Sequence, residues 1–195
     1  MSVPYSLKKM ILNVIQYNCS AINSVYIYED FLENLEYLNS LKNKLVTHFD
    51  KKDNKDYQTN VYAKMTNWTE LLEDSDFNFL HEKILRTLNN TLKLRIPTPN
   101  ESLRYSYTDS WGMVHKEGDF THDHIHSYNV WSGAFYFDVP HPTRMWFEDF
   151  QKDVELKTNM LVLFHGITKH RVPSFTGDKL RYSMGFNIKI EQLDT

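Results

Sequence analysis

Cysteine is almost absent from this sequence: Cys19 is the only one among 195 residues. A lone cysteine excludes an internal disulfide framework and any cysteine-rich zinc module. It is typical of a reducing compartment, so we expect an intracellular, cytoplasmic protein.

Glycine and proline are also scarce, with 6 of each, which excludes a collagen-like or low-complexity chain. Long apolar runs are missing as well, since no stretch approaches the roughly 18 apolar residues of a membrane span. Near the start, Asn13 and Gln16 interrupt a short apolar run too early for a signal peptide. We therefore expect no membrane association.

Neither sign of charge dominates, because 22 basic residues face 25 acidic ones and the net charge is −3. This balance argues against a broad basic surface for nucleic acid, which we do not expect as a partner. At roughly 150 residues per domain, the length predicts a single domain over residues 1–195. The oligomeric state stays open, a homodimer included.

The first part of the chain, residues 1–98, is predicted to be mainly helical. Apolar residues spaced by three or four between Phe31 and Leu45 indicate one helix, with Asp30 as its cap. A second helix is expected over about 75–93, capped by Ser75 or Asp76. The charged segment between them, which begins at His48, is predicted to be a solvated loop.

Pro97 and Pro99 mark a change of pattern, after which residues 99–195 favour short strands rich in aromatic and β-branched residues. The candidate strands are 103–107, 110–116, 120–126, 130–138, 144–149, 159–164, 169–173 and 180–190. Many short strands after a helical block indicate a β-sandwich or barrel with helices packed on one side.

Histidine is the residue type that stands out, because seven of the nine lie between His115 and His170. Three of them, His122, His124 and His126, alternate along one predicted strand and would share a face. Two imidazoles at positions i and i+2 can reach one metal ion, so either His124 with His126 or His122 with His124 would serve. A third ligand would come from His165 or His170. Zinc, iron, manganese, nickel and copper all accept such ligands.

A second feature is the pair Arg181 and Ser183, which share one face of the last predicted strand. The apolar residues around them indicate that the strand is buried, and a buried guanidinium needs an anionic partner. Two parallel hydrogen bonds from the guanidinium and one from the hydroxyl would hold a carboxylate, for example that of a bound dicarboxylate.

These residues together resemble the 2-oxoglutarate/Fe(II)-dependent oxygenases related to prolyl hydroxylases. The resemblance rests on an ordered set of motifs over about 103–190, namely Trp111, Gly118, His124-x-His126, Ser132-Gly133-x-x-Tyr136, Phe164, His170, Arg181-x-Ser183 and Phe186-Asn187. It implies an α+β fold: a double-stranded β-helix, or jelly roll, with a supporting N-terminal helical layer.

The resemblance also assigns roles to residues. It implies that His124, His126 and His170 hold Fe(II), although the wider family has a carboxylate where this chain has His126. It implies that Arg181, Ser183 and Tyr136 bind the cosubstrate 2-oxoglutarate. His122, His115 and Trp111 are candidates for the substrate mouth.

The function expected from the resemblance is a dioxygenase that uses dioxygen and 2-oxoglutarate to hydroxylate a protein side chain or a small molecule. One alternative is a cupin-type metal-dependent dioxygenase, although the glutamate of the cupin pattern is replaced here by Val130 and Trp131. A metal hydrolase is another, although its usual motifs are incomplete here. A third is a jelly-roll domain that binds a partner without catalysis.

Overall fold

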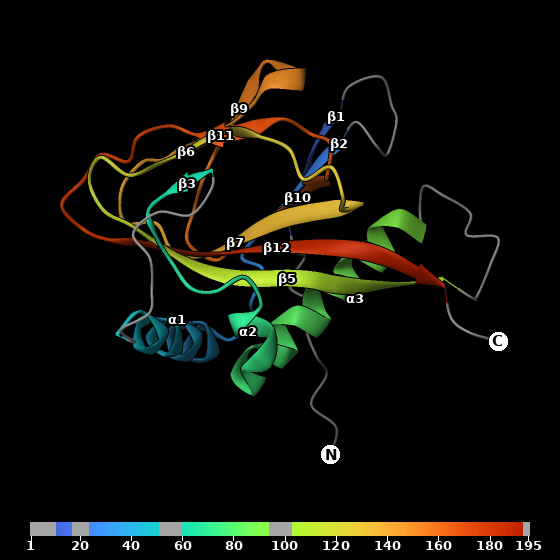
Figure 1. Cartoon of the computed structure of the whole chain (residues 1–195), viewed down its shortest axis with the longest axis horizontal. Helices are drawn as coiled ribbons and strands as arrows, with labels where there is room; N and C mark the ends of the chain where they lie inside the picture. Colours follow the sequence, from blue (N-terminus) through green and yellow to red (C-terminus); the bar gives the residue numbers. More distant parts are fainter. Residues whose placement is uncertain (1–10, 17–23, 51–59, 94–102, 193–195) are drawn as a thin grey trace.

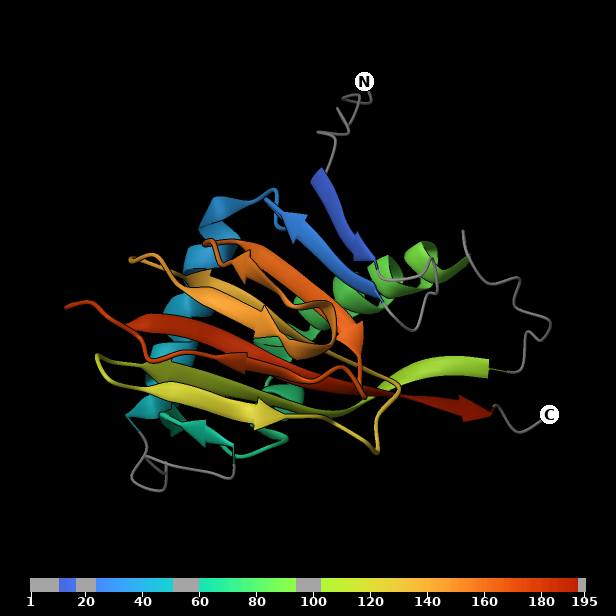
Figure 2. The same cartoon turned by 90° about the horizontal axis from the view of Figure 1, so that it is seen from above.

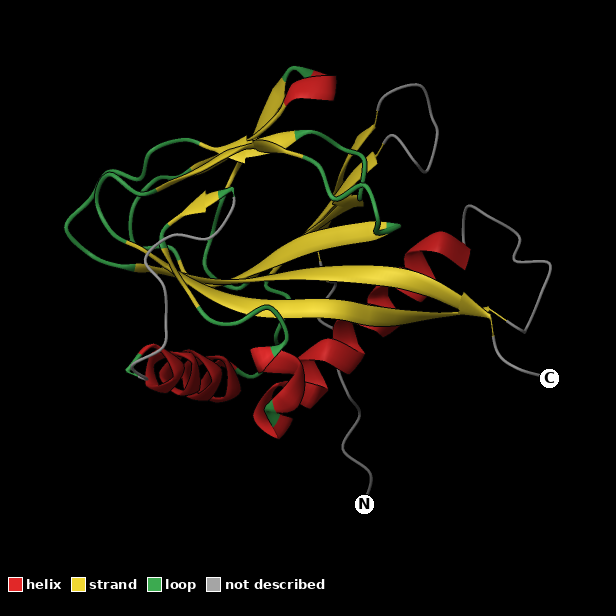
Figure 3. Ribbon diagram, in the orientation of Figure 1, coloured by secondary structure: helices red, strands yellow, loops and turns green. Residues whose placement is uncertain are grey.

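The computed structural model describes residues 11–16, 24–50, 60–93 and 103–192. Two antiparallel sheets face each other, and helices cover the outer face of the larger one (Figures 1 and 3). The helices are α1 (Leu35–Phe49), α2 (Glu70–Glu73) and α3 (Asn78–Lys93), with short 3-10 turns η1 (Ser75–Phe77) and η2 (Glu148–Phe150). In the described part of the chain, none of the helices has the length and apolarity to cross a membrane.

The larger sheet has seven strands in the order β1-β2-β10-β7-β12-β5-β4. They are β1 (Ile11–Gln16), β2 (Ser24–Glu29), β10 (Met160–His165), β7 (Trp131–Asp138), β12 (Arg181–Gln192), β5 (Leu103–His115) and β4 (Lys64–Met65). Its longest pair, β5 and β12, runs side by side, as the view from above shows (Figure 2).

The smaller sheet has five strands in the order β3-β6-β11-β8-β9. They are β3 (Val61–Tyr62), β6 (Phe120–His124), β11 (His170–Val172), β8 (Arg144–Phe147) and β9 (Lys152–Glu155). These strands are short and pair antiparallel. Two facing sheets with helices on one side confirm the architecture predicted from the strand pattern.

The central strands of the larger sheet are buried on both faces. On β7, Phe135 and Phe137 pack against the helices, whereas Ala134 and Tyr136 face the smaller sheet. Strand β12 alternates in the same way, but its inner side is polar. Its outer side chains, Met184, Phe186 and Ile188, join the core beside the helices. Residues Arg181, Ser183 and Gly185 line the space between the sheets. The alternation of a strand therefore places a polar row inside the fold.

The first helix begins later than predicted. Asn34 caps it, because its Oδ1 accepts hydrogen bonds from the backbone N–H groups of Glu36 and Tyr37 at 2.9 and 3.0 Å. The predicted cap, Asp30, instead has a left-handed backbone with a φ of 51° before the helix. The spacing of apolar residues could not show that Phe31 and Leu32, which are also buried, precede the helix and do not belong to it.

The predicted division at residue 98 was incomplete, because four strands precede it. β1 and β2 extend the larger sheet beside β10, and β3 and β4 join the edges of the two sheets. Strand β9 was not predicted, whereas segments 103–107 and 110–116 form one continuous strand. The prediction for His48 was also wrong: it is buried and its two ring nitrogens bond the carboxylates of Glu70 and Asp74 at 2.6 and 2.7 Å.

A buried histidine between α3 and the larger sheet makes the fold sensitive to acid. Burial lowers the pKa of His81 from its ordinary 6.5 to about 4, and its Nε2 lies 2.9 Å from the Ser110 hydroxyl. Between these two pH values the unfolded chain binds a proton that the folded chain does not, so stability falls as the pH falls.

We predict that His81 contributes up to about 3 kcal/mol to the loss of unfolding free energy between pH 7 and pH 4. A plot of the free energy of unfolding, measured with urea, against pH should have a shallower slope for His81→Gln than for the wild type. The exposed His122→Gln variant is the control and should keep the wild-type slope. Equal slopes for all three proteins would contradict the assignment.

Candidate active site

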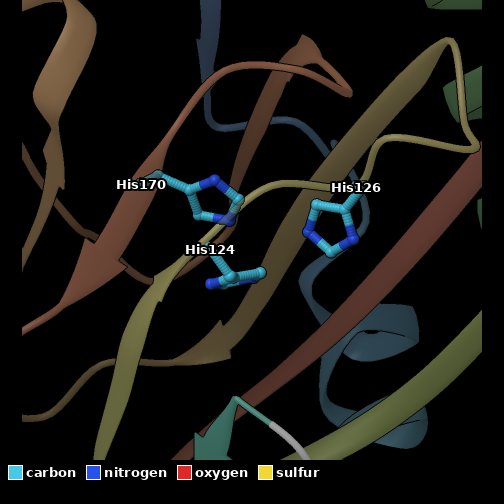
Figure 4. Close-up of side chains that lie close together, drawn as sticks. All are labelled: His124, His126 and His170. Carbon is cyan, nitrogen blue, oxygen red and sulfur yellow. The ribbon is translucent and has the colours of Figure 1, made fainter.

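Three histidines converge between the sheets (Figure 4). His124 ends β6 and His170 begins β11, and because the two are register partners their ring centroids lie 4.2 Å apart. His126 follows in the loop after β6, with its ring centroid 4.8 Å from that of His124 and 5.3 Å from that of His170. One ligand nitrogen from each residue lies within 4.8 Å of the other two, so a single ion could be held among them.

Backbone carbonyls orient two of these rings. Nδ1 of His124 lies 2.8 Å from the His122 carbonyl oxygen, and Nδ1 of His170 lies 2.9 Å from that of Thr168. A carbonyl only accepts, so each Nδ1 carries the proton and each Nε2 keeps its lone pair. This is the arrangement by which proteins fix metal-ligating imidazoles.

The rings are also kept neutral. Burial lowers the pKa of His124, and burial together with the neighbouring His124 lowers the pKa of His126 to about 3. Burial, followed by the influence of the other two rings, holds the pKa of His170 well below its ordinary range. Neutral imidazole is the form that binds a metal, so no proton has to be displaced near pH 7.

His126 lies outside the strand in which the sequence placed it, because β6 ends at His124. Its loop is held by a close contact with the turn after β10: the His126 N–H donates to the Gly166 carbonyl at 2.7 Å. A side chain at Gly166 would collide with backbone, since a Cβ there would lie 2.0 Å from the Asn129 carbonyl oxygen. Sequence reasoning missed Gly166 as a positioning residue, because only the contact across the fold reveals it.

The donor set fits a divalent transition ion. Three imidazoles suit iron, zinc, nickel or copper. The nearest acidic residue along the chain, Asp123, faces away, since its Oδ2 lies 3.3 Å from Nη1 of Arg171. Within the described residues, the group of potential ligands contains no carboxylate.

A cavity extends from the histidines to Arg181, with about 490 Å³ of empty volume. The Arg181 side chain is 1% exposed, and its Nε and Nη1 have no hydrogen-bond partner among the described residues. Its guanidinium carbon lies 5.3 Å from the centroid of the Phe175 ring. Burial lowers the pKa of Arg181 to about 10, so it stays charged near neutrality.

Further polar groups surround this guanidinium. Ser183 is two residues along β12 on the same face, and it pairs across the sheet with Tyr136 of β7. Burial raises the pKa of Tyr136 to about 12, which keeps its hydroxyl protonated and able to donate. The predicted grouping of Arg181, Ser183 and Tyr136 in one pocket is thus what the structure contains.

The three residues expected at the substrate mouth have separate positions. His115 pairs with Arg181 across β5 and β12, is 1% exposed, and has both ring nitrogens unpartnered among the described residues. Its place is therefore the arginine end of the cavity. Trp111 lies between this cavity and a second one that also borders His124 and His126.

His122 lines neither of these cavities; it is exposed and its ring packs edge-on against Phe120 at 4.7 Å. His165, the other candidate for the third ligand, packs against Trp131 with ring centroids 5.6 Å apart. The geometry thus favours His124, His126 and His170 over the alternative sets.

Comparison with known proteins shows what this chain resembles. A family model described as "Putative 2OG-Fe(II) oxygenase" matches residues 109–157, a segment that includes His124 and His126. No curated protein matches the sequence.

Solved structures share the fold. A prolyl-4-hydroxylase from Pseudomonas putida has a TM-score of 0.64 and 12% identity, covering 85% of this chain and 91% of that chain. The viral collagen prolyl hydroxylase of Paramecium Bursaria Chlorella virus-1, solved with 2-oxoglutarate, has a TM-score of 0.60 and 13% identity, covering 84% and 94%. The α-ketoglutarate-dependent epimerase SnoN of nogalamycin biosynthesis has a TM-score of 0.68 and 10% identity, covering 87% and 80%.

These structures show that the fold is the double-stranded β-helix, or jelly roll, as predicted. The resemblance to 2-oxoglutarate/Fe(II)-dependent oxygenases, drawn from the order of the motifs, is likewise confirmed.

Position 126 offers a direct test of the metal site. We predict that His126→Asp keeps or tightens Mn(II) binding, because a carboxylate replaces one neutral ligand with a charged one. His126→Ala should weaken binding by about tenfold or more, because even the loss of a residue that hydrogen-bonds to a metal ligand lowers metal affinity by about that factor. Calorimetric titration with Mn(II) measures both.

His165→Ala provides the control, because its ring packs on Trp131 away from the cluster. It should leave Mn(II) affinity unchanged, and a melting curve on each variant reports the fold. Unaltered affinity in His126→Ala would mean that His126 only packs in the loop.

Proposed function

We propose that this protein is an Fe(II)- and 2-oxoglutarate-dependent dioxygenase that hydroxylates its substrate. The observation that carries the proposal is one cavity with two complementary ends. At one end three neutral imidazoles gather, and at the other a buried guanidinium has donors without a partner in the described part of the protein.

The metal end suits Fe(II), which His124, His126 and His170 would hold through their free nitrogens. Fe(II) with bound 2-oxoglutarate would supply the activation of dioxygen, coupled to oxidative decarboxylation of the cosubstrate to succinate and carbon dioxide. The protein's own residues keep the imidazoles neutral and fix two of them through backbone carbonyls.

The arginine end suits the distal carboxylate of 2-oxoglutarate. Arg181 would donate two parallel hydrogen bonds, and the hydroxyls of Ser183 and Tyr136 would complete the site. We extend this set to His115, which is neutral because burial, followed by the charge of Arg181, holds its pKa well below the ordinary range. A neutral ring can donate one further hydrogen bond without adding charge.

The competing functions account for less of this structure. A cupin-type dioxygenase or a metal hydrolase would use the histidines but has no need for a buried guanidinium in the same cavity. A domain that binds a partner without catalysis would have no use for the enclosed donors. A dicarboxylate that also reaches the metal uses both ends, and the remaining partners are then dioxygen and a protein side chain or small molecule.

The role of Arg181 leads to an unusual prediction about stability. A buried charge with no salt-bridge partner among the described residues is costly, and replacing even paired buried charges by apolar groups of similar volume often stabilises a protein by about 1–4 kcal/mol. We therefore predict that Arg181→Met raises the melting temperature in the absence of 2-oxoglutarate, yet weakens 2-oxoglutarate binding by about 100-fold, the worth of two charge-assisted hydrogen bonds.

Calorimetry with 2-oxoglutarate on the Mn(II)-loaded protein measures the affinity, and succinate release with Fe(II) measures the activity. Arg144→Met, which removes an exposed arginine paired with Asp153, is the control and should bind 2-oxoglutarate normally. The proposal fails if Arg181→Met binds 2-oxoglutarate as the wild type does.

A further inference from the structure

A second cavity borders the histidine cluster, with about 660 Å³ of empty volume. It shares Val61, Trp111, His124 and His126 with the first cavity but does not include Arg181. The remaining lining residues are Asn60, Trp68, Asp109 and Asn187. A molecule in this cavity would contact the metal ligands without contacting the arginine end.

Among the described residues that line this cavity, Asp109 is the only one with an acidic or basic side chain apart from the two histidines of the cluster. Among the described residues, no lysine, arginine or histidine forms a salt bridge with it; the acidic partners in those bridges lie elsewhere. The cavity therefore presents one negative charge for which the described part of the protein supplies no counter-ion.

The Asp109 carboxylate is held in place by neutral donors. Nδ2 of Asn187 donates to its Oδ2 at 3.0 Å, and the hydroxyl of Thr108 lies 2.9 Å from the same oxygen and 2.8 Å from Oδ1 of Asn129, between which its one hydrogen is shared. Asn187 is itself fixed by Ser132, whose hydroxyl donates to Oδ1 of Asn187 at 2.8 Å. Both bonds end on Oδ2, so Oδ1 has no donor among the described residues and is available to a ligand.

Aromatic rings complete the cavity. Trp68 and Trp111 meet edge to face with centroids 4.8 Å apart. Trp111 can lie against β12 because residue 185 is glycine: a Cβ there would lie 2.5 Å from the Trp111 ring. Indole faces attract cations through the ring quadrupole, most strongly where water is excluded. A fixed carboxylate beside two indoles is a combination that recognises an ammonium or guanidinium group.

We propose that this cavity binds a cationic group of the substrate, an ammonium or a guanidinium, and that Asp109 and the two tryptophans select for it. The proposal rests on the proposed function in that the bound molecule is the one to be oxidised. The formal charges are consistent with this proposal. The two positive charges of Fe(II) would be balanced by the two negative charges of 2-oxoglutarate, so the bound metal would not neutralise Asp109 once the cosubstrate is in place.

Blocked amino acids test the proposal with matched pairs. The protein is loaded with Zn(II) and 2-oxoglutarate, which prevents turnover, and binding is followed by ligand-detected NMR. Nα-acetyl-lysine N-methylamide is compared with its norleucine counterpart, and Nα-acetyl-arginine N-methylamide with its citrulline counterpart. We expect at least one cationic ligand to bind about tenfold more tightly than its neutral partner, the effect of one charge-assisted hydrogen bond. The pair that shows the preference identifies ammonium or guanidinium.

Asp109→Asn tests the origin of this preference, because asparagine keeps an oxygen for the Asn187 and Thr108 donors while losing the charge. The preference should disappear in this variant and persist in the control Asp138→Asn, whose carboxylate pairs with Lys42 at 3.0 Å. Melting curves verify that both variants fold. In the wild type, raising the salt concentration should weaken binding of the cationic ligand but not of the neutral one.

Two results would overturn the inference: equal binding of charged and neutral partners in the wild type, or a preference that survives in Asp109→Asn. Affinity for 2-oxoglutarate, measured on the same samples, reports the proposed function separately. If 2-oxoglutarate binds and no cation is preferred, only the substrate inference fails. If 2-oxoglutarate does not bind, the proposed function fails whatever the cation result.

Discussion

The burial of Arg181 without a salt-bridge or hydrogen-bond partner for its Nε and Nη1 among the described residues is the constraint on which the rest of this structure depends. A guanidinium that is 1% exposed and has donors without partners lowers the stability of the ligand-free fold. The surrounding layers offset that cost with apolar packing under the helices and between the sheets. We propose that the fold retains this residue to receive a negatively charged ligand.

The alternation of strand side chains explains how one chain builds both the core and the site. On β12 the side chains that face the helices are Met184, Phe186 and Ile188, whereas Arg181, Ser183 and Asn187 face the space between the sheets. Antiparallel pairing then adds His115 from β5 and Tyr136 from β7 beside the arginine. The smaller sheet supplies His124 and His170 as register partners, so these histidines and the arginine lie on opposite sides of one cavity.

Sequence periodicity could predict much of this arrangement, because it reports which side of a strand is buried. The alternation in β12 placed Arg181 and Ser183 together, and the ordered motifs placed His170 with His124. Periodicity could not predict features set by contacts across the fold. Examples are the loop that carries His126 against Gly166, the position of His115 beside Arg181 rather than at the mouth, and the burial of His48 between two carboxylates. Short early strands such as β3 were missed because two residues hold too little pattern.

The most direct test of the central claim is a crystal structure of the protein with Mn(II) and 2-oxoglutarate, in which anomalous scattering locates the metal. The account predicts a single manganese ion bound by His124, His126 and His170, with the distal carboxylate of 2-oxoglutarate hydrogen-bonded to Arg181. A manganese ion bound elsewhere, or a 2-oxoglutarate molecule that leaves the Arg181 donors without a partner, would contradict it.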